Sequence, residues 1–201
     1  MTTKKATSKR ELTRARVIQA AIACIERDGF HAAHTNRIAE EAGVSWGVLQ
    51  YHFGDKDGLL QAVMDQIFDD FSQTLSSISL DSSSLRQRVD QLIKSVWQLT
   101  SKQEYRVSVA ILRNAGKDRS SSIDGKKQLA DWARKTALLW ERLFEEGGNH
   151  PANSDVAKRL LFATLRGMAD EINPSRNKTK KAIAEECSAL GQAVTYLLEQ
   201  N

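Results

Sequence analysis

Four neighbouring residues near position 50 have the chemistry needed to contact a nucleic acid. The Gln50 side chain can form two hydrogen bonds with the edge of an adenine, and the Tyr51 hydroxyl can reach a phosphate. Gly47 would let the backbone approach a groove closely, because it has no side chain. Trp46 either contacts thymine methyl groups or packs against a core. These residue types indicate DNA recognition by one short face.

Two short helices, over residues 35–42 and 45–53, are predicted to position this face. The first begins at Thr35. In the link between them, Gly43 permits the positive φ of a tight turn, and Ser45 can cap the second helix. This arrangement is typical of a helix-turn-helix, whose second helix enters the major groove while the first crosses the backbone. The alternative is an ordinary helical hairpin inside an all-α core.

The helical phase of the second helix favours the helix-turn-helix. When Leu49 and Phe53 face the core, the opposite side carries Gly47, Gln50 and Tyr51, at about 100° per residue. A buried hairpin gives no reason to place a glycine, a glutamine and a tyrosine on so short an outward face, whereas a surface that contacts DNA does.

Positive charge is concentrated at the N-terminus. Residues 1–16 contain six basic residues and one acidic residue, whereas the remaining chain has 23 basic and 24 acidic residues. A basic arm on a nearly neutral body indicates a polyanionic partner, and the alternative is a solvated tail. We expect residues 1–10 to be disordered without DNA and the first helix to follow Thr13.

The composition indicates an all-α globular protein. The 201 residues are 41% hydrophobic and 27% charged, with only 2 prolines and 11 glycines, which argues against disorder and against a turn-rich β fold. Apolar residues at three- and four-residue spacing predict about nine helices. Residues 117–127 are polar and predicted to form a mobile loop. No apolar run is long enough to span a bilayer, so we expect a cytoplasmic protein without a membrane partner.

No motif indicates an enzyme, and no cofactor is predicted. The sequence has no phosphate-binding glycine loop, nucleophile elbow or pair of catalytic carboxylates. His31 and His34 lack a third ligand at suitable spacing, so no metal site is expected.

Residues 17–63 resemble the N-terminal domain of the TetR/AcrR family of transcriptional regulators. Their sequence is VIQAAIACIERDGFHAAHTNRIAEEAGVSWGVLQYHFGDKDGLLQAV. The resemblance implies a homodimer that binds a palindromic double-stranded operator and is released by a small effector. It also implies two domains: a basic arm with the helix-turn-helix over residues 1–58, and a helical effector-binding and dimerisation domain over residues 59–201.

The resemblance also assigns roles to individual residues. It implies base contacts from Trp46, Gly47 and Gln50, and it implies phosphate contacts from Thr35, Ser45, Tyr51, His52 and Lys56. The family usually has a small or basic residue at position 46 and tyrosine at position 50. Because both departures lie on the recognition surface, the operator sequence cannot be taken from relatives.

Several aromatic and basic residues of the second domain are candidates for an effector site. Core packing is the ordinary interpretation of each aromatic residue at helical spacing. The alternative is a pocket for an apolar or amphipathic effector that bears a carboxylate or acyl group. The candidate residues are Trp97, Arg106, Val109, Arg113, Trp132, Trp140 and Phe162.

The last two predicted helices each carry two stripes, one of large apolar residues and one of small residues. Small residues allow close helix approach, so we expect both helices to pair with their twofold mates in a four-helix bundle. The alternative is that the second stripe covers a loop of the same chain. The expected interface residues are Leu161, Ala163, Gly167, Met168, Ala189, Ala193 and Tyr196.

Two other functions remain open at this stage. One is a DNA-binding regulator that activates transcription or has no small effector. The other is a helical protein-interaction adaptor in which the turn between the short helices is only structural. An adaptor would not show the steep loss of DNA binding with salt that phosphate contacts produce.

Overall fold

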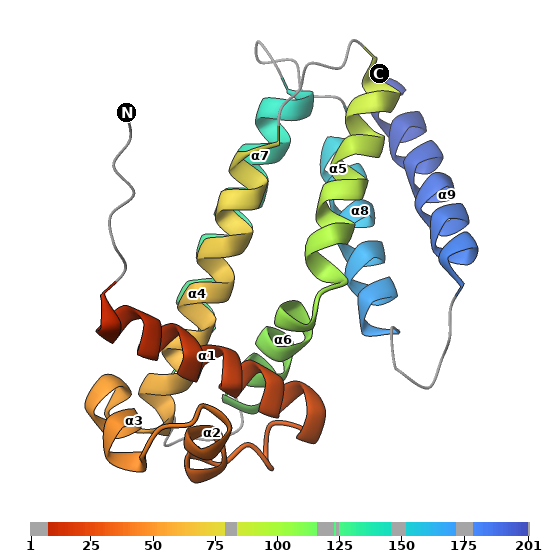
Figure 1. Cartoon of the computed structure of the whole chain (residues 1–201). Coiled ribbons are helices and arrows are strands. Elements are labelled where there is room, and N and C mark those ends of the chain that lie inside the picture. Colours follow the sequence, from red (N-terminus) through yellow and green to blue (C-terminus); the bar gives the residue numbers. More distant parts are fainter. Residues whose placement is uncertain are drawn as a thin grey trace, which may run out of the picture. The chain divides into compact units, whose positions relative to one another are not determined.

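The computed structural model of the chain is built from α-helices (Figure 1). In the part of the chain that it describes there are nine helices and no strand, which confirms the predicted all-α class. Compact packing divides the chain into two units, described separately below: residues 1–68 with 107–126, and residues 69–106 with 127–201. The described residues are 8–78, 84–115, 123, 125–145, 152–171 and 179–200.

The first unit contains α1 (Lys9–Asp28), α2 (Thr35–Glu41) and α3 (Trp46–Phe53), together with the first part of α4 (Lys56–Ser76) and the last part of α6 (Gln103–Ala115). Figure 1 shows α2 and α3 beside α1. Apolar side chains at three- and four-residue spacing make the core of this unit. At most 1% of each of the following is exposed: Val17, Ala21, Ile22, Ile38, Leu49, Leu59 and Val63.

Helix α1 begins several residues before the position that the sequence analysis expects. The Ser8 hydroxyl accepts a hydrogen bond from the Glu11 backbone N–H, and the Glu11 carboxylate accepts one from the Ser8 backbone N–H. This reciprocal capping box satisfies two free N–H groups and starts the helix at Lys9. The prediction of disorder over residues 1–10 is therefore wrong for residues 8–10, and residues 1–7 lie outside the described part. The spacing of Ser8 and Glu11 is the sequence pattern that indicates this start.

The second unit contains α5 (Leu85–Thr100), most of α7 (Gly125–Phe144), α8 (Ser154–Asp170) and α9 (Lys180–Glu199). Helix α5 packs against both α8 and α9, and α8 packs against α9. The three helices lie side by side in Figure 1. They bury Leu92, Leu161, Leu165 and Val194 completely.

The polar segment 117–127, predicted to be a loop, includes the start of a helix. Helix α7 begins at Gly125, so the prediction is wrong for residues 125–127, while residues 117–122 and 124 lie outside the described part. None of the described helices is both long enough and apolar enough to cross a membrane.

Candidate nucleic-acid interface

A short, well-capped turn joins α2 to α3. Gly43 has a φ of +60°, the left-handed conformation that glycine adopts without strain. The Val44 backbone N–H donates to the Ala39 carbonyl over 2.9 Å, which closes the turn. The Ser45 hydroxyl accepts from the Val48 backbone N–H at 3.3 Å and caps α3. The local structure predicted for the turn is confirmed at both Gly43 and Ser45.

Helix α3 has one buried side and one exposed side. Leu49 is 1% exposed and Phe53 is 9% exposed, so these two side chains anchor the helix in the core. On the other side, Trp46 is 51% exposed and Tyr51 is 72% exposed, and Gly47 and Gln50 are exposed with them. The predicted phase of the helix is confirmed. We call the surface of Trp46, Gly47, Gln50 and Tyr51 the α3 face.

The residues expected to contact phosphate lie at or near the ends of helices. Thr35 is the first residue of α2, and Lys56 is the first residue of α4. The Lys56 ammonium lies 5.1 Å from the centre of the Phe30 ring. The His52 ring is 5.3 Å from the Tyr51 ring, in an edge-on arrangement. Ser45 uses its hydroxyl to cap α3, and a hydroxyl oxygen can accept a second hydrogen bond.

Two arginines of α1 hold α3 from the side, a role that the sequence analysis does not predict. The Arg14 guanidinium donates to the His52 carbonyl oxygen at 3.3 Å and lies 4.8 Å from the centre of the Phe53 ring. The Arg10 guanidinium lies 5.7 Å from the centre of the Tyr51 ring. A cation at the C-terminal end of a helix interacts favourably with its last carbonyls. These contacts fix α3 relative to α1.

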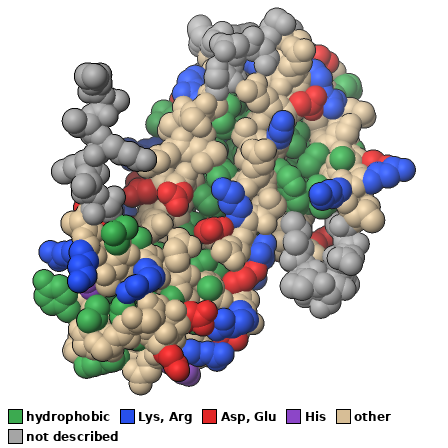
Figure 2. All heavy atoms as spheres, in the orientation of Figure 1, with side chains coloured by type: hydrophobic (Ala, Val, Ile, Leu, Met, Phe, Trp, Pro, Cys, Tyr) green, Lys and Arg blue, Asp and Glu red, His purple; other side chains and the backbone are tan. Residues whose placement is uncertain are grey.

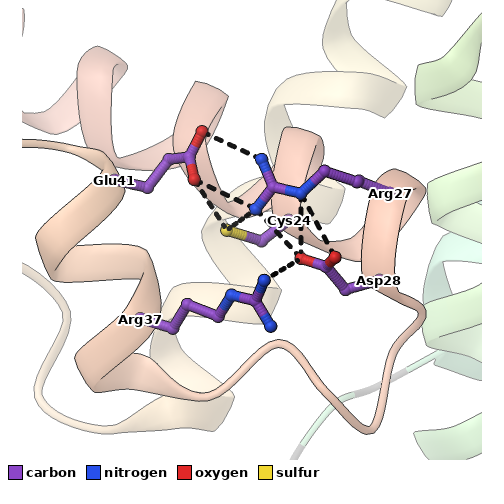
Figure 3. Close-up of polar contacts among 5 residues, drawn as sticks. All are labelled: Cys24, Arg27, Asp28, Arg37 and Glu41. Atoms are coloured by element: carbon purple, nitrogen blue, oxygen red, sulfur yellow. Dashed lines mark hydrogen bonds and ion pairs between the residues drawn. The ribbon is translucent and has the colours of Figure 1, made fainter.

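A second polar cluster fixes α2 relative to α1 (Figure 3). The Arg27 guanidinium lies at its centre, 3.0 Å from the Glu41 carboxylate and 2.9 Å from the Asp28 carboxylate. Arg37 contacts the Asp28 carboxylate at 3.2 Å. Hydrogen bonds from Arg27 lower the pKa of both Asp28 and Glu41. Burial raises the pKa of the neighbouring Cys24 thiol, which therefore stays protonated at neutral pH.

The side chains of this unit make a surface suited to a polyanion. Figure 2 shows basic and hydrophobic side chains close together at the lower left, over α1 and α3. Among the described residues, no three His, Cys, Asp or Glu side chains are grouped so that they could hold a metal ion. The α3 face and the arginines beside it offer hydrogen-bond donors and acceptors, aromatic rings and cations, which are the groups that contact bases and phosphates.

The first unit is also similar in sequence to known DNA-binding regulators. Residues 17–63 match the family described as bacterial regulatory proteins, tetR family. These residues are similar to the DNA-binding domains of that family, and we call residues 17–63 the TetR-type domain. A domain of this type contains two short helices joined by a capped turn, with the outer face of the second helix exposed, as α2 and α3 are here.

The curated relatives extend the TetR-type match a little further along the chain. Over 85 residues, the chain is 34% identical to the HTH-type transcriptional regulator BetI of Vibrio parahaemolyticus, covering 41% of this chain and 43% of that protein. Over 91 residues, it is 36% identical to BetI 2 of Chromohalobacter salexigens, covering 44% of each. The aligned part spans less than half the length of these curated relatives.

Solved structures share the fold over nearly the whole chain. Salmonella enterica GusR is 20% identical, with a TM-score of 0.72, and the match covers 96% of this chain and 98% of GusR. A tetR-family regulatory protein from Rhodococcus RHA1 is 19% identical, with a TM-score of 0.73, and the match covers 97% of this chain and 100% of that one. At this identity the likeness shows the fold alone.

Outside the TetR-type domain, the predicted effector residues lie in several different environments. Trp140 is fully buried, and its indole N–H donates to the Ser154 hydroxyl at 2.7 Å. The Trp132 ring lies 5.5 Å from the Phe71 ring. Arg106 donates to the Ser101 carbonyl at 3.0 Å. Trp140 therefore has the structural role that the ordinary interpretation gives it.

The remaining effector candidates also lie on several different elements. Trp97 lines a groove between α5 and α9, in which none of the other six candidates takes part. Val109 and Arg113 belong to the first unit, and Phe162 is half-buried on α8. Helical spacing predicts that aromatic residues lie on helices, but it does not indicate which of them share a cavity.

The predicted interface residues divide into two groups. Leu161 is fully buried inside its own chain, and Met168 is only 7% exposed, so neither has much surface to offer a partner. The prediction of an interface role for Leu161 is therefore corrected: this side chain belongs to the core. The exposed members are Ala163, Gly167, Ala189, Ala193 and Tyr196. We call these five residues the α8–α9 face.

Proposed function

We propose that this chain is a sequence-specific DNA-binding transcriptional regulator, acting in the cytoplasm as a homodimeric repressor that a small effector releases from its operator. The observation that carries the proposal is the α3 face. Trp46, Gly47, Gln50 and Tyr51 are exposed on a helix whose other side is anchored by Leu49 and Phe53. A helix so anchored can enter a major groove as a rigid element.

Each group on the α3 face has a definite role in this proposal. Gln50 pairs with an adenine edge, and the Trp46 ring contacts thymine methyl groups. Gly47 lets the start of α3 lie close to the base edges. Thr35, Ser45, Tyr51, His52 and Lys56 contact phosphates, and so position the helix without reading the sequence.

The dimer proposed here uses the α8–α9 face. A groove of about 520 Å³ is lined by residues of both α8 and α9, among them Gly167, Ala189 and Ala193. A Cβ atom built on Gly167 meets no other atom of the described residues within 4 Å, so none of these residues requires glycine at this position. A second copy packed closely against α8 would require it. The twofold axis would then set the recognition helices about 34–36 Å apart, one turn of DNA.

The DNA-binding function can be tested with duplexes that the protein itself selects. Duplexes that bind the full chain are selected from a random pool, and binding of one selected duplex is compared with that of a scrambled duplex over a range of salt concentrations. We expect tighter binding to the selected duplex and a steep loss of affinity with salt for both. A helical adaptor would give neither result.

Two variants connect that measurement to the α3 face. The double variant Gln50→Ala/Tyr51→Ala removes two exposed side chains from the face, whereas the control Gln19→Ala removes an exposed side chain of α1 that is not part of the face. The double variant is expected to lose preference for the selected duplex, and the control to keep it. Equal behaviour of the two variants would contradict the assigned role of α3.

A further inference from the structure

We propose that the groove between α5 and α9 binds an amphipathic organic anion, that is, a small molecule with an apolar body and a carboxylate or similar acidic group. The groove is open to solvent and has a volume of about 460 Å³, within the usual range of small-molecule sites. Hydrophobic side chains are visible between the two helices in Figure 2. The groove would be the effector site of the regulator proposed above, and in this respect it rests on that function.

The interior of the groove is suited to an apolar body. Ile93 and Trp97 from α5 face Ile183, Ala184 and Cys187 from α9 across it. Trp97 and Ile183 are half-buried, so each leaves part of a large apolar side chain exposed in the groove. Burial raises the pKa of the Cys187 thiol, which is therefore uncharged at neutral pH and adds no repulsion toward an anion.

The charges around the groove favour an anion over a cation. Asp90, the single acidic side chain among the described residues that line the groove, is already paired with Arg86 over 2.8 Å, and Arg86 also donates to the Ser188 carbonyl oxygen. Lys94 and Lys180 also line the groove and are exposed, and neither has an acidic partner among the described residues. These two ammonium groups beside an apolar floor complement a molecule with one acidic end.

The groove stays open in the proposed dimer because it lies on another side of α9. It uses Ile183, Ala184 and Cys187, whereas the α8–α9 groove uses Ala189 and Ala193. No residue lines both grooves. A ligand between α5 and α9 would therefore contact one side of α9, while the other side of α9 pairs with the second copy in the proposed dimer. Ligand binding could then change the geometry of the dimer by moving α9.

The proposal is tested on the full chain without DNA, so its failure would leave the DNA-binding function untouched. Octanoate and octylammonium, which share an apolar body and differ in charge, are titrated by calorimetry. We expect octanoate to bind and octylammonium to bind at least about tenfold more weakly. Equal binding of the two, or no binding of octanoate, would overturn the proposal.

Variants place that binding in the groove. Lys94→Gln/Lys180→Gln is expected to weaken octanoate binding about tenfold, which corresponds to about 1.4 kcal/mol of lost charge-assisted contact. The control Lys126→Gln/Lys181→Gln makes the same change in net charge at two exposed lysines outside the groove and is expected to bind as the wild type does. Equal effects of the two double variants would refute the groove as the site.

Cysteine reactivity gives a second readout that does not depend on a substitution. The chain has two cysteines, of which Cys24 is buried and Cys187 lines the groove. Octanoate should slow the reaction of Cys187 with N-ethylmaleimide, followed by mass spectrometry of the labelled peptide, whereas octylammonium should not. Unchanged labelling of Cys187 at saturating octanoate would place the ligand elsewhere and overturn the proposal.

Discussion

The α3 face and the α8–α9 face are both exposed in the single chain, but they differ in chemistry. The α3 face carries an indole, an amide and a phenol, with Arg10 and Arg14 beside it. The α8–α9 face carries alanines, a glycine and one tyrosine, and its groove is bordered by Glu171 and Glu186. The first surface offers directional hydrogen bonds and positive charge to a polyanion. The second surface has mostly small side chains, which would let the α8 and α9 helices of a second copy pack closely against it.

The largest effect is expected from introducing charge into the α8–α9 face. Ala193→Glu would bury an unpaired carboxylate at the proposed twofold contact, so the chain should become a folded monomer and bind its operator weakly. Sedimentation velocity and titration with the selected duplex measure the two consequences. Ala133→Glu, the same change at an exposed alanine of α7, is the control and should remain dimeric. A wild-type chain that sediments as a monomer at micromolar concentration would contradict the dimer.

A smaller effect, confined to sequence preference, is expected from the α3 face. Gln50→Ala should relax the preference at one base position in each half-site, at a cost of about 1–3 kcal/mol for the correct base. Lys56→Ala should instead weaken binding to all duplexes alike and reduce its salt dependence. Competition among duplexes with single base changes distinguishes the two results. If both variants lost affinity equally for all duplexes, the assignment of base recognition to Gln50 and phosphate contact to Lys56 would be wrong.

The contact of α1 with α3 predicts a still smaller change. Arg14→Ala removes the hydrogen bond to the His52 carbonyl and the contact with the Phe53 ring, so the unfolding free energy should fall by about 0.5–1 kcal/mol. Denaturant unfolding measures this loss. Arg16→Ala removes the same charge from an exposed arginine with no described contact, and it should unfold as the wild type does.

The smallest expected effect is a dependence of stability on acidic pH. Hydrogen bonds from Arg27 lower the pKa of Asp28 and Glu41 in the folded chain. Their stabilising contribution is therefore complete above the ordinary carboxylate pKa, and it is lost as the pH falls below about 4 toward the lowered values. Glu41→Gln should flatten the fall in denaturation midpoint over this range. Glu40→Gln, at an exposed neighbour, should leave the curve unchanged.

Tertiary contacts of the first unit could not be predicted, even where its helices could. Arg14 and His52 are 38 positions apart, and Arg27 and Glu41 are 14 apart. The basic arm showed only that arginines were concentrated at the N-terminus. Which of them contact a ring or a carbonyl depends on how α1 crosses α3, and no local pattern contains that angle.

The second unit shows the same limit more strongly. The two-stripe pattern of α8 and α9 identified helices with more apolar surface than one contact needs. It did not distinguish Leu161, which is buried in its own chain, from Gly167, which is exposed. Likewise, the spacing of the tryptophans did not separate the buried Trp140 from Trp97 in its groove. A stripe of apolar residues predicts that the stripe is buried, but it does not show whether the same chain or a second copy covers it.

Features that depend on near neighbours along the chain follow from the order of the residues alone. Gly43 and Ser45 define the turn, and the phase of Leu49 and Phe53 turns Gln50 and Tyr51 outward, because caps and helical periodicity act within a few residues. Three other features follow only from the folded chain: which helices share a groove, which arginines contact α3 and which apolar stripe remains exposed. They depend on contacts between residues far apart in the chain, whose geometry is set by packing the whole unit at once.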